Sequence, residues 1–191
     1  MSLQNLEEVI LEFVSGFSDL SPLRKLSKLK SLHLENLRKV TDFGGLNGLA
    51  SLRYLHIDGT LAWNQPINDF SFLAGLPNLE VFSLGFIINK SPFPVLRSVL
   101  ELINLKKVSI GRATFYTSEY AFLETALPSA IGAKWDLWWD YEDKFDFLGK
   151  GAGYVKKNSS SATQRCELFE KNFIEMKLKS RSIIDRYHRK H

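Results

Sequence analysis

The apolar residues of the chain follow a repeated spacing, L-x-x-L-x-x-L-x-L, in which other large apolar residues replace leucine at some positions. Copies begin at Leu3, Leu26, Leu49, Leu76 and Leu102. They lie 23, 23, 27 and 26 residues apart, and self-similarity at such a period indicates a protein built from stacked repeats. A weaker sixth copy is predicted around Trp135-x-Leu137.

The last two apolar positions of each copy predict a short β-strand. They are separated by one residue, as in Leu32-x-Leu34 and Leu55-x-Ile57, and a period of two places both side chains on one face of a strand. The leucines before them are predicted to fill the same core from the segment that returns to the next strand. Because no single copy can bury its apolar side alone, neighbouring copies must stack, which predicts a parallel sheet.

Helix and strand signals change toward the C-terminus. The segments "SPFPVLRSVLELINL" and "TSEYAFLETALP" have prolines and capping residues that predict helices. One or two aromatic strands are predicted in "KWDLWWDYEDKFDFLGKG", followed by a Gly/Ser/Lys-rich connection, "GKGAGYVKKNSSSATQ". A helix is predicted from about Ala162, with an amphipathic stripe formed by Cys166, Phe169, Phe173, Met176, Ile183, Ile184 and Tyr187.

The motif D-[LF]-x-x-L-x-x-L-x-x-L occurs at Asp19, Asp42 and Asp69. With the repeated leucines, it makes residues 1 to about 138 resemble a leucine-rich repeat protein of the short-repeat type found in bacteria and in the cytoplasm. The resemblance implies an α/β solenoid, with a curved parallel sheet on the concave side and loops, 3-10 turns or helices on the convex side. The family's usual Asn after the strand is absent, because the matching positions hold Val14, Leu37, Thr60, Ile87 and Ala113.

This reading divides the chain into a solenoid of five to six repeats, residues 1–138, and a C-terminal cap, residues 139–191. The cap would contain the aromatic strands, the Gly/Ser/Lys linker and the amphipathic basic helix. Terminal repeats expose apolar surface, so a repeat protein needs covered ends. The alternative for the C-terminal helix is a free element that binds a partner.

Composition and charge narrow the function classes. The 191 residues are 45% hydrophobic and contain one cysteine, Cys166, which excludes an intramolecular disulfide. The start "MSLQNLEEVI" lacks the pattern of a secretory signal, and no window is long and apolar enough for a membrane helix. We therefore expect a cytoplasmic monomer that has no contact with a membrane.

The net charge of +4 is unevenly distributed. Residues 150–191 hold 11 Lys/Arg against 4 Asp/Glu, whereas the remaining residues hold 14 against 17. A basic C-terminal region makes nucleic-acid binding an alternative function. A solvated helix face explains the same charges more simply, and the region lacks interleaved exposed aromatics, so nucleic acid is not the expected partner.

The residues that flank the core positions of each strand are predicted to form three columns on the concave surface. The column after the core pair holds Glu12, Glu35, Asp58, Gly85, Gly111 and Trp138. The central column includes His33 and His56, and the column before the pair includes Tyr54 and Lys107. Carboxylates in line on neighbouring strands repel each other unless a positive group lies between them.

These columns predict a protein-binding surface rather than an enzyme. The partner residues are expected to be Glu12, Glu35, Asp58, His33, His56, Tyr54, Lys107 and Trp138, and the partner to be a protein that offers a basic segment. Neither a cofactor nor a metal is predicted. An alternative is a metal-binding or hydrolytic site around His33 and His56, in which Ser83 would be the nucleophile and Asp58 the orienting acid.

Overall fold

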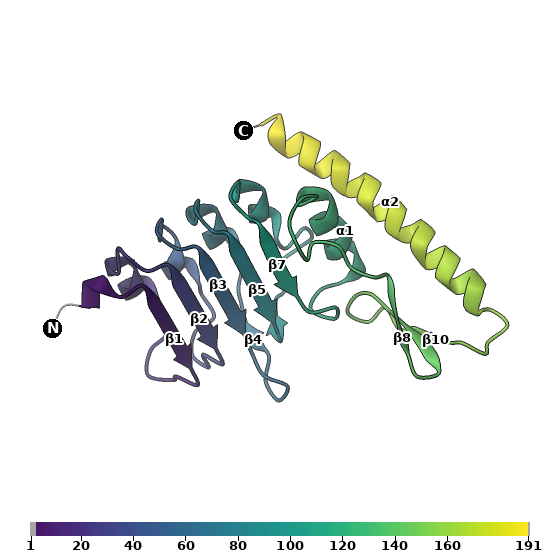
Figure 1. The fold of residues 1–191 in the computed structure, drawn as a ribbon, viewed down its shortest axis with the longest axis horizontal. Coiled ribbons are helices and arrows are strands. Elements are labelled where there is room, and N and C mark those ends of the chain that lie inside the picture. The colour runs from purple at the N-terminus through teal and green to yellow at the C-terminus, as the bar shows by residue number, and fades with distance from the viewer. Residues whose placement is uncertain (1–2, 191) are drawn as a thin grey trace. The chain divides into compact units, whose positions relative to one another are not determined.

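The computed structural model describes residues 3–190. The chain divides into two compact units, Met1–Gly111 and Arg112–His191. The first unit contains the parallel strands, and the second contains both α-helices and a small antiparallel sheet (Figure 1). The first unit therefore ends earlier in the chain than the predicted repeat region, 1–138.

The first unit is built on a five-stranded parallel sheet with the order β1-β2-β3-β5-β7. The strands are β1 (Glu8–Glu12), β2 (Ser31–Glu35), β3 (Tyr54–Asp58), β5 (Val81–Gly85) and β7 (Lys107–Ile110). Each falls on the last two apolar positions of one copy of the repeat. The prediction of one parallel strand per copy is thus confirmed for the first five copies.

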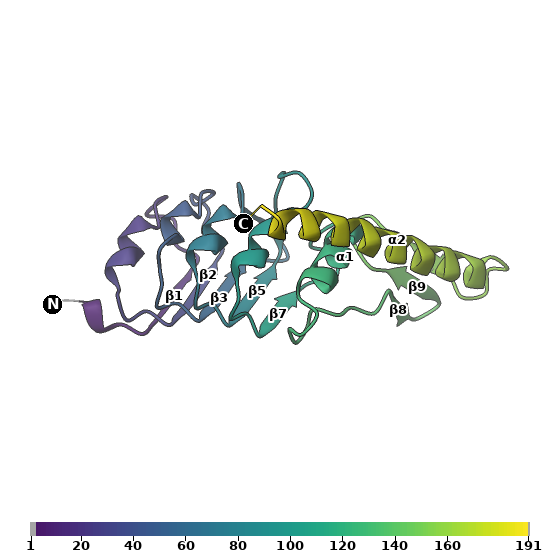
Figure 2. The same cartoon turned by 90° about the horizontal axis from the view of Figure 1, so that it is seen from above.

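The segments before and between the strands carry 3-10 helices that form a second layer (Figure 2). They are η1 (Leu3–Asn5), η2 (Ser21–Lys25), η3 (Gly44–Leu46), η4 (Ser71–Gly75) and η5 (Arg97–Glu101). Consecutive members from η2 to η5 pack against each other. The helix predicted within residues 91–105 forms as the 3-10 helix η5, after the prolines at 92 and 94.

The repeated aspartate starts three of these 3-10 helices. In each case its carboxylate accepts a hydrogen bond from the backbone N–H two residues later. The acceptors are Asp19, Asp42 and Asp69, at 2.8, 2.7 and 2.8 Å. The carboxylate satisfies an N–H group that has no helical partner at this point, which is why the motif keeps Asp.

The core lies between the sheet and the 3-10 layer. Both apolar positions of β2, β3, β5 and β7 are buried, whereas Val9 and Leu11 of the end strand β1 are only partly covered. Phe43, Phe70 and Phe72 fill the core from the returning segments. This arrangement fixes the backbone of the sheet and leaves every second side chain of each strand on the opposite face.

Gln65 replaces the Asn that the resemblance leads one to expect after a strand. It belongs to β4 (Gln65–Pro66), which pairs in parallel with β6 (Ile87–Ile88). Its buried amide accepts a hydrogen bond from the Leu37 N–H at 2.9 Å and donates one to the Val40 carbonyl at 2.7 Å. The turn after β2 is therefore satisfied by a side chain from the next repeat.

The second unit combines α1 (Thr117–Ala126) and α2 (Ala162–His188) with the antiparallel sheet β10-β9-β8. The strands are β8 (Trp138–Tyr141), β9 (Lys144–Phe147) and β10 (Tyr154–Lys156). The two helices pack against each other, and Lys177 donates a hydrogen bond to Glu124 at 3.0 Å. Both predicted helices and two aromatic strands are confirmed.

Two predictions for this region are wrong. The connection 149–164 contains the strand β10, because Val155 is buried against the aromatic side of the sheet. The sixth repeat forms no strand at Trp135 in the described residues; Trp135 instead packs edge-on against Tyr120 at 5.0 Å. Within residues 3–190, no helix is both long and apolar enough to cross a membrane.

Candidate functional site on the strand face

The strand register confirms the three columns for the first unit. The column before the core pair is Glu8, Ser31, Tyr54, Val81 and Lys107; the central column is Ile10, His33, His56, Ser83 and Ser109. The third column is Glu12, Glu35, Asp58 and Gly85, while Gly111 lies one residue beyond β7. The face opposite the core thus presents unlike side chains over a uniform apolar layer.

Three carboxylates in this third column, Glu12, Glu35 and Asp58, form what we call the acidic row. They are register partners on adjacent strands, which places their backbones about 4.8 Å apart. Their side chains are 47%, 25% and 22% exposed, respectively. The row is therefore accessible to a partner yet partly screened from water, where charge interactions are stronger than on an open surface.

Gly85 continues the row without a side chain. A Cβ atom at this position would lie 2.8 Å from Oδ1 of Asp58, too close for ordinary contact. The missing side chain therefore makes room for the Asp58 carboxylate to extend over β5. Oδ1 of Asp58 is buried and has no hydrogen-bond partner among residues 3–190, so this end of the row presents an unsatisfied acceptor.

Two histidines lie beside the row. The rings of His33 and His56 are in edge-to-face contact, with centroids 4.3 Å apart. Nδ1 of His33 faces Glu12 at 3.7 Å and Nε2 faces Glu35 at 3.6 Å, while Nε2 of His56 lies 3.3 Å from Asp58. The strands thus bring five of the predicted site residues into one cluster, with each imidazole beside at least one carboxylate.

Glu12, His33 and Glu35 are also the only potential metal-ligand set found among the described residues, with donor atoms within 4.8 Å of one another. Both residue types are zinc ligands. However, the two carboxylates face different nitrogens of the one imidazole ring. The set provides three donors, from one histidine and two carboxylates, which is one fewer than the four ligands of a structural zinc site.

The hydrolytic alternative lacks its central contact. Ser83 is the register partner of His56, but no hydrogen bond joins their side chains in the described part of the chain, and Nε2 of that imidazole is instead hydrogen-bonded to Asp58 at 3.3 Å. The thiol of Cys166 belongs to the buried cluster of the second unit, and burial raises its pKa, which weakens it as a nucleophile.

Tyr54 and Lys107 lie on the same face but away from the acidic row. They belong to the first column, at the opposite ends of the strands, and Val81 separates them. Both are exposed. They widen the available surface and add a cation and a phenol, but the structure does not bring them into the carboxylate–histidine cluster.

Trp138 is not part of this face. It lies in β8 of the second unit, half-buried, and makes edge-to-face contacts with Phe145 and Phe147 at 6.5 and 6.4 Å. Its predicted place in the third column was wrong because, in the described residues, β8 belongs to the antiparallel sheet and no sixth strand joins the parallel sheet. Its packing partners give the side chain a structural role there.

A hollow at the carboxyl ends of β1–β3 contains residues that the repeat does not predict, among them Phe13, Asn36 and Arg38. Phe13 and Asn36 are the first residues after their strands and have positive φ values, 55° and 51°. Asn tolerates a positive φ, so Asn36 was a weak sequence signal for this backbone conformation. Phe13 gave no such signal, since bulky residues rarely adopt a positive φ.

No family model matches the sequence, and no curated protein matches it. Among solved structures, 27 chains match. One is internalin C2 from Listeria monocytogenes, with 28% sequence identity and a TM-score of 0.44 over 62% of this chain. The match covers 47% of the internalin chain, so this chain spans about half the length of that protein.

Proposed function

We propose that this chain is a non-enzymatic interaction module, a leucine-rich repeat solenoid that binds a protein partner through the strand face. The leucine spacing over residues 1–138 and the five in-register strands support the solenoid. Residues 139–191 would form its C-terminal cap. The cytoplasmic location and the monomeric state expected from the sequence belong to the same proposal.

The acidic row carries the proposal. Three carboxylates in register, on strands about 4.8 Å apart, repel each other, and nothing in the repeat requires acidic residues there. The repulsion lowers the stability of the free chain and is relieved when a cation enters. A rigid sheet also loses little conformational entropy on binding. A segment of partner chain with Lys or Arg side chains spaced along the row would supply these cations, and the rigid sheet would bind it with little loss of conformational entropy.

The geometry favours guanidinium or ammonium groups that approach from solvent. Glu12 is the most exposed member of the row, at 47% against 25% for Glu35 and 22% for Asp58, so it is the carboxylate that such a group reaches most easily. Arg is the better match, because its planar fork can donate two hydrogen bonds to one carboxylate. Tyr54 and Lys107 would contact other parts of the partner at the opposite ends of the strands.

A peptide-display selection tests this directly. Immobilised full chain should enrich peptides rich in Arg and Lys, and one enriched peptide is then synthesised and titrated by calorimetry. The variant E35K/D58K should weaken its affinity at least tenfold, about 1.4 kcal/mol. The control E101K/E175K makes the same change in net charge at two exposed residues outside the strand face.

The control separates recognition from general electrostatics. We expect E101K/E175K to bind within about twofold of the wild type, since neither residue belongs to the strand face and exposed charges are screened at 0.1 M salt. Equal losses in both double variants would mean that net charge alone attracts the peptide. Unchanged affinity in E35K/D58K would remove the acidic row from the binding site.

A further inference from the structure

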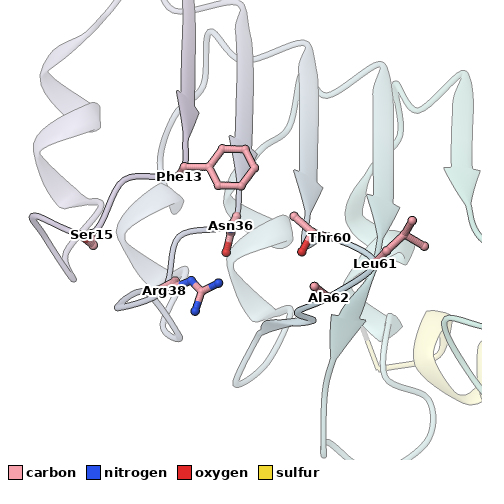
Figure 3. Close-up of a pocket in the computed structure, with 7 residues that line it drawn as sticks. All are labelled: Phe13, Ser15, Asn36, Arg38, Thr60, Leu61 and Ala62. Carbon is pink, nitrogen blue, oxygen red and sulfur yellow. The ribbon is translucent and has the colours of Figure 1, made fainter.

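A hollow separate from the acidic row opens at the carboxyl ends of β1, β2 and β3 (Figure 3). Its volume is about 570 Å³, which falls in the range of small-molecule and peptide side-chain sites. Its lining includes Phe13, Asn36, Arg38 and Leu61. All of them belong to the first unit, so the hollow is formed by three consecutive repeats.

Phe13 combines two unfavourable features. Its φ of 55° lies in the left-handed region, where a bulky side chain is strained, and the side chain is 65% exposed. Phe86, the first residue after β5, has the same combination, with a φ of 40° and an exposed ring. An exposed ring contributes little hydrophobic stabilisation to the folded chain. A bound group that covers the ring would therefore explain why a large aromatic residue is tolerated there.

Asn36 contributes an unsatisfied acceptor to the hollow. The residue is only 3% exposed, and its Oδ1 has no hydrogen-bond partner among residues 3–190. Figure 3 shows this oxygen directed away from the strand, on the side of Arg38. Buried amide oxygens are normally paired. A ligand that brings an N–H group into the hollow would supply the missing donor.

Arg38 contributes a positive charge held in place. Its guanidinium lies over the ring of Trp63, 5.4 Å from the ring centre, which restricts the side chain without neutralising it. No carboxylate forms an ion pair with Arg38 within the described residues. A guanidinium in this state is suited to a planar carboxylate, which can accept two parallel hydrogen bonds.

We propose that this hollow binds the C-terminal residue of a peptide with a large apolar side chain. The three groups of one such residue match the three features of the hollow. Its carboxylate accepts hydrogen bonds from Arg38, and its amide N–H donates to Oδ1 of Asn36. Its side chain covers Phe13 and Leu61. A free carboxylic acid with an apolar group shares part of this chemistry but lacks the peptide N–H and the preceding backbone. This site does not depend on the acidic row.

Defined peptides test the proposal with the full chain. Acetyl-Gly-Gly-Phe with a free carboxylate should bind saturably. Calorimetry measures the affinity, and backbone NMR shifts at Asn36 and Leu61 report the place of binding. The C-terminal amide of the same peptide should bind at least tenfold more weakly. R38Q should cause a similar loss, while K39Q, which removes the neighbouring charge outside the hollow, should stay within about twofold.

Phe13 gives a readout that a purely structural role would not produce. F13G removes the strained aromatic residue, so its unfolding midpoint should equal or exceed that of the wild type while its affinity for the peptide falls at least fivefold. Loss of both stability and binding would instead make Phe13 a structural residue and overturn its assignment. E35K/D58K replaces acidic charges beside the hollow with basic ones, so it should bind this peptide at least as tightly as the wild type, which keeps the test independent of the acidic row.

Three results would overturn the proposal. The first is no saturable binding at millimolar peptide, and the second is equal affinity for the acid and the amide. The third is an equal effect of R38Q and K39Q. If 3-phenylpropanoic acid, which has the carboxylate and the ring but no amide N–H, binds as tightly as the tripeptide, the ligand is a small carboxylic acid and the assignment to a peptide terminus is wrong.

Discussion

Glu12 and Glu35 are register partners on the neighbouring strands β1 and β2, so two carboxylates face the same side of the sheet at adjacent positions. Asp58 extends the row on β3. Proteins commonly accept a loss of stability at surfaces that bind a partner. The row therefore makes a prediction about the free chain as well as about binding.

Replacing the middle carboxylate should stabilise the free protein. E35Q keeps the size and hydrogen-bonding capacity of the side chain and removes the charge that repels both neighbours. At pH 8, where an ordinary histidine is neutral, we expect a gain of about 0.5 kcal/mol at low salt and almost none at 1 M salt. Urea denaturation measures it, with E101Q as the exposed control; a loss of stability at low salt would contradict the repulsion.

The amide of Gln65 should be essential to the turn after β2. Q65A leaves the buried Leu37 N–H and Val40 carbonyl without partners, which should cost about 2–4 kcal/mol. N64A, at the exposed neighbouring residue, should stay within about 0.5 kcal/mol of the wild type. Urea denaturation followed by tryptophan fluorescence provides both values, and equal midpoints for the two variants would rule out this role.

The leucine spacing was sufficient to predict the sheet and its columns. A period of two fixes which side chains of a strand face the core, so Leu32 and Leu34 determine where His33 and Glu35 point. The same reasoning failed at Trp135, because the aromatic and leucine positions fit the spacing, whereas Trp135 packs against Tyr120 of α1 and the parallel sheet ends at β7 in the described residues.

Other features had no local signal in the sequence. Gln65 reaches Leu37 over 28 residues, a contact that depends on the two-residue strands β4 and β6. The positive φ of Phe13 contradicts its ordinary preference. The hollow near Asn36 and Arg38 depends on such features, which is why the sequence predicted the acidic row but not this second surface.

Gly59 should tolerate no side chain. A Cβ atom there would lie 2.2 Å from the carbonyl oxygen of Phe86 and 2.5 Å from that of Trp63. Both obstacles are backbone atoms, so G59A can fit only if the strands shift, and we expect a loss of about 3 kcal/mol. G16A is the matched control, because its Cβ would have no neighbour within 4 Å. Equal urea midpoints for the two variants would show that the backbone adjusts freely.

The carboxylate of Asp69 should stabilise η4 in a pH-dependent way. Hydrogen bonds from the Ser71 hydroxyl and then from its backbone N–H lower the pKa of Asp69. Because the pKa of Asp69 is lower in the folded state, the stabilisation is complete at a pH above its pKa in the unfolded state, near 4. The stabilisation is lost as the pH falls through the pKa of the folded state. The free energy of unfolding of the wild type should exceed that of D69A by about 1 kcal/mol at pH 7, and by progressively less below pH 4.

D69N keeps an acceptor oxygen that does not titrate, so its gain in stability over D69A should be the same from pH 3 to pH 7. Urea denaturation across this range measures both differences, and a gap between wild type and D69A that widens as the pH falls would contradict the assigned bond.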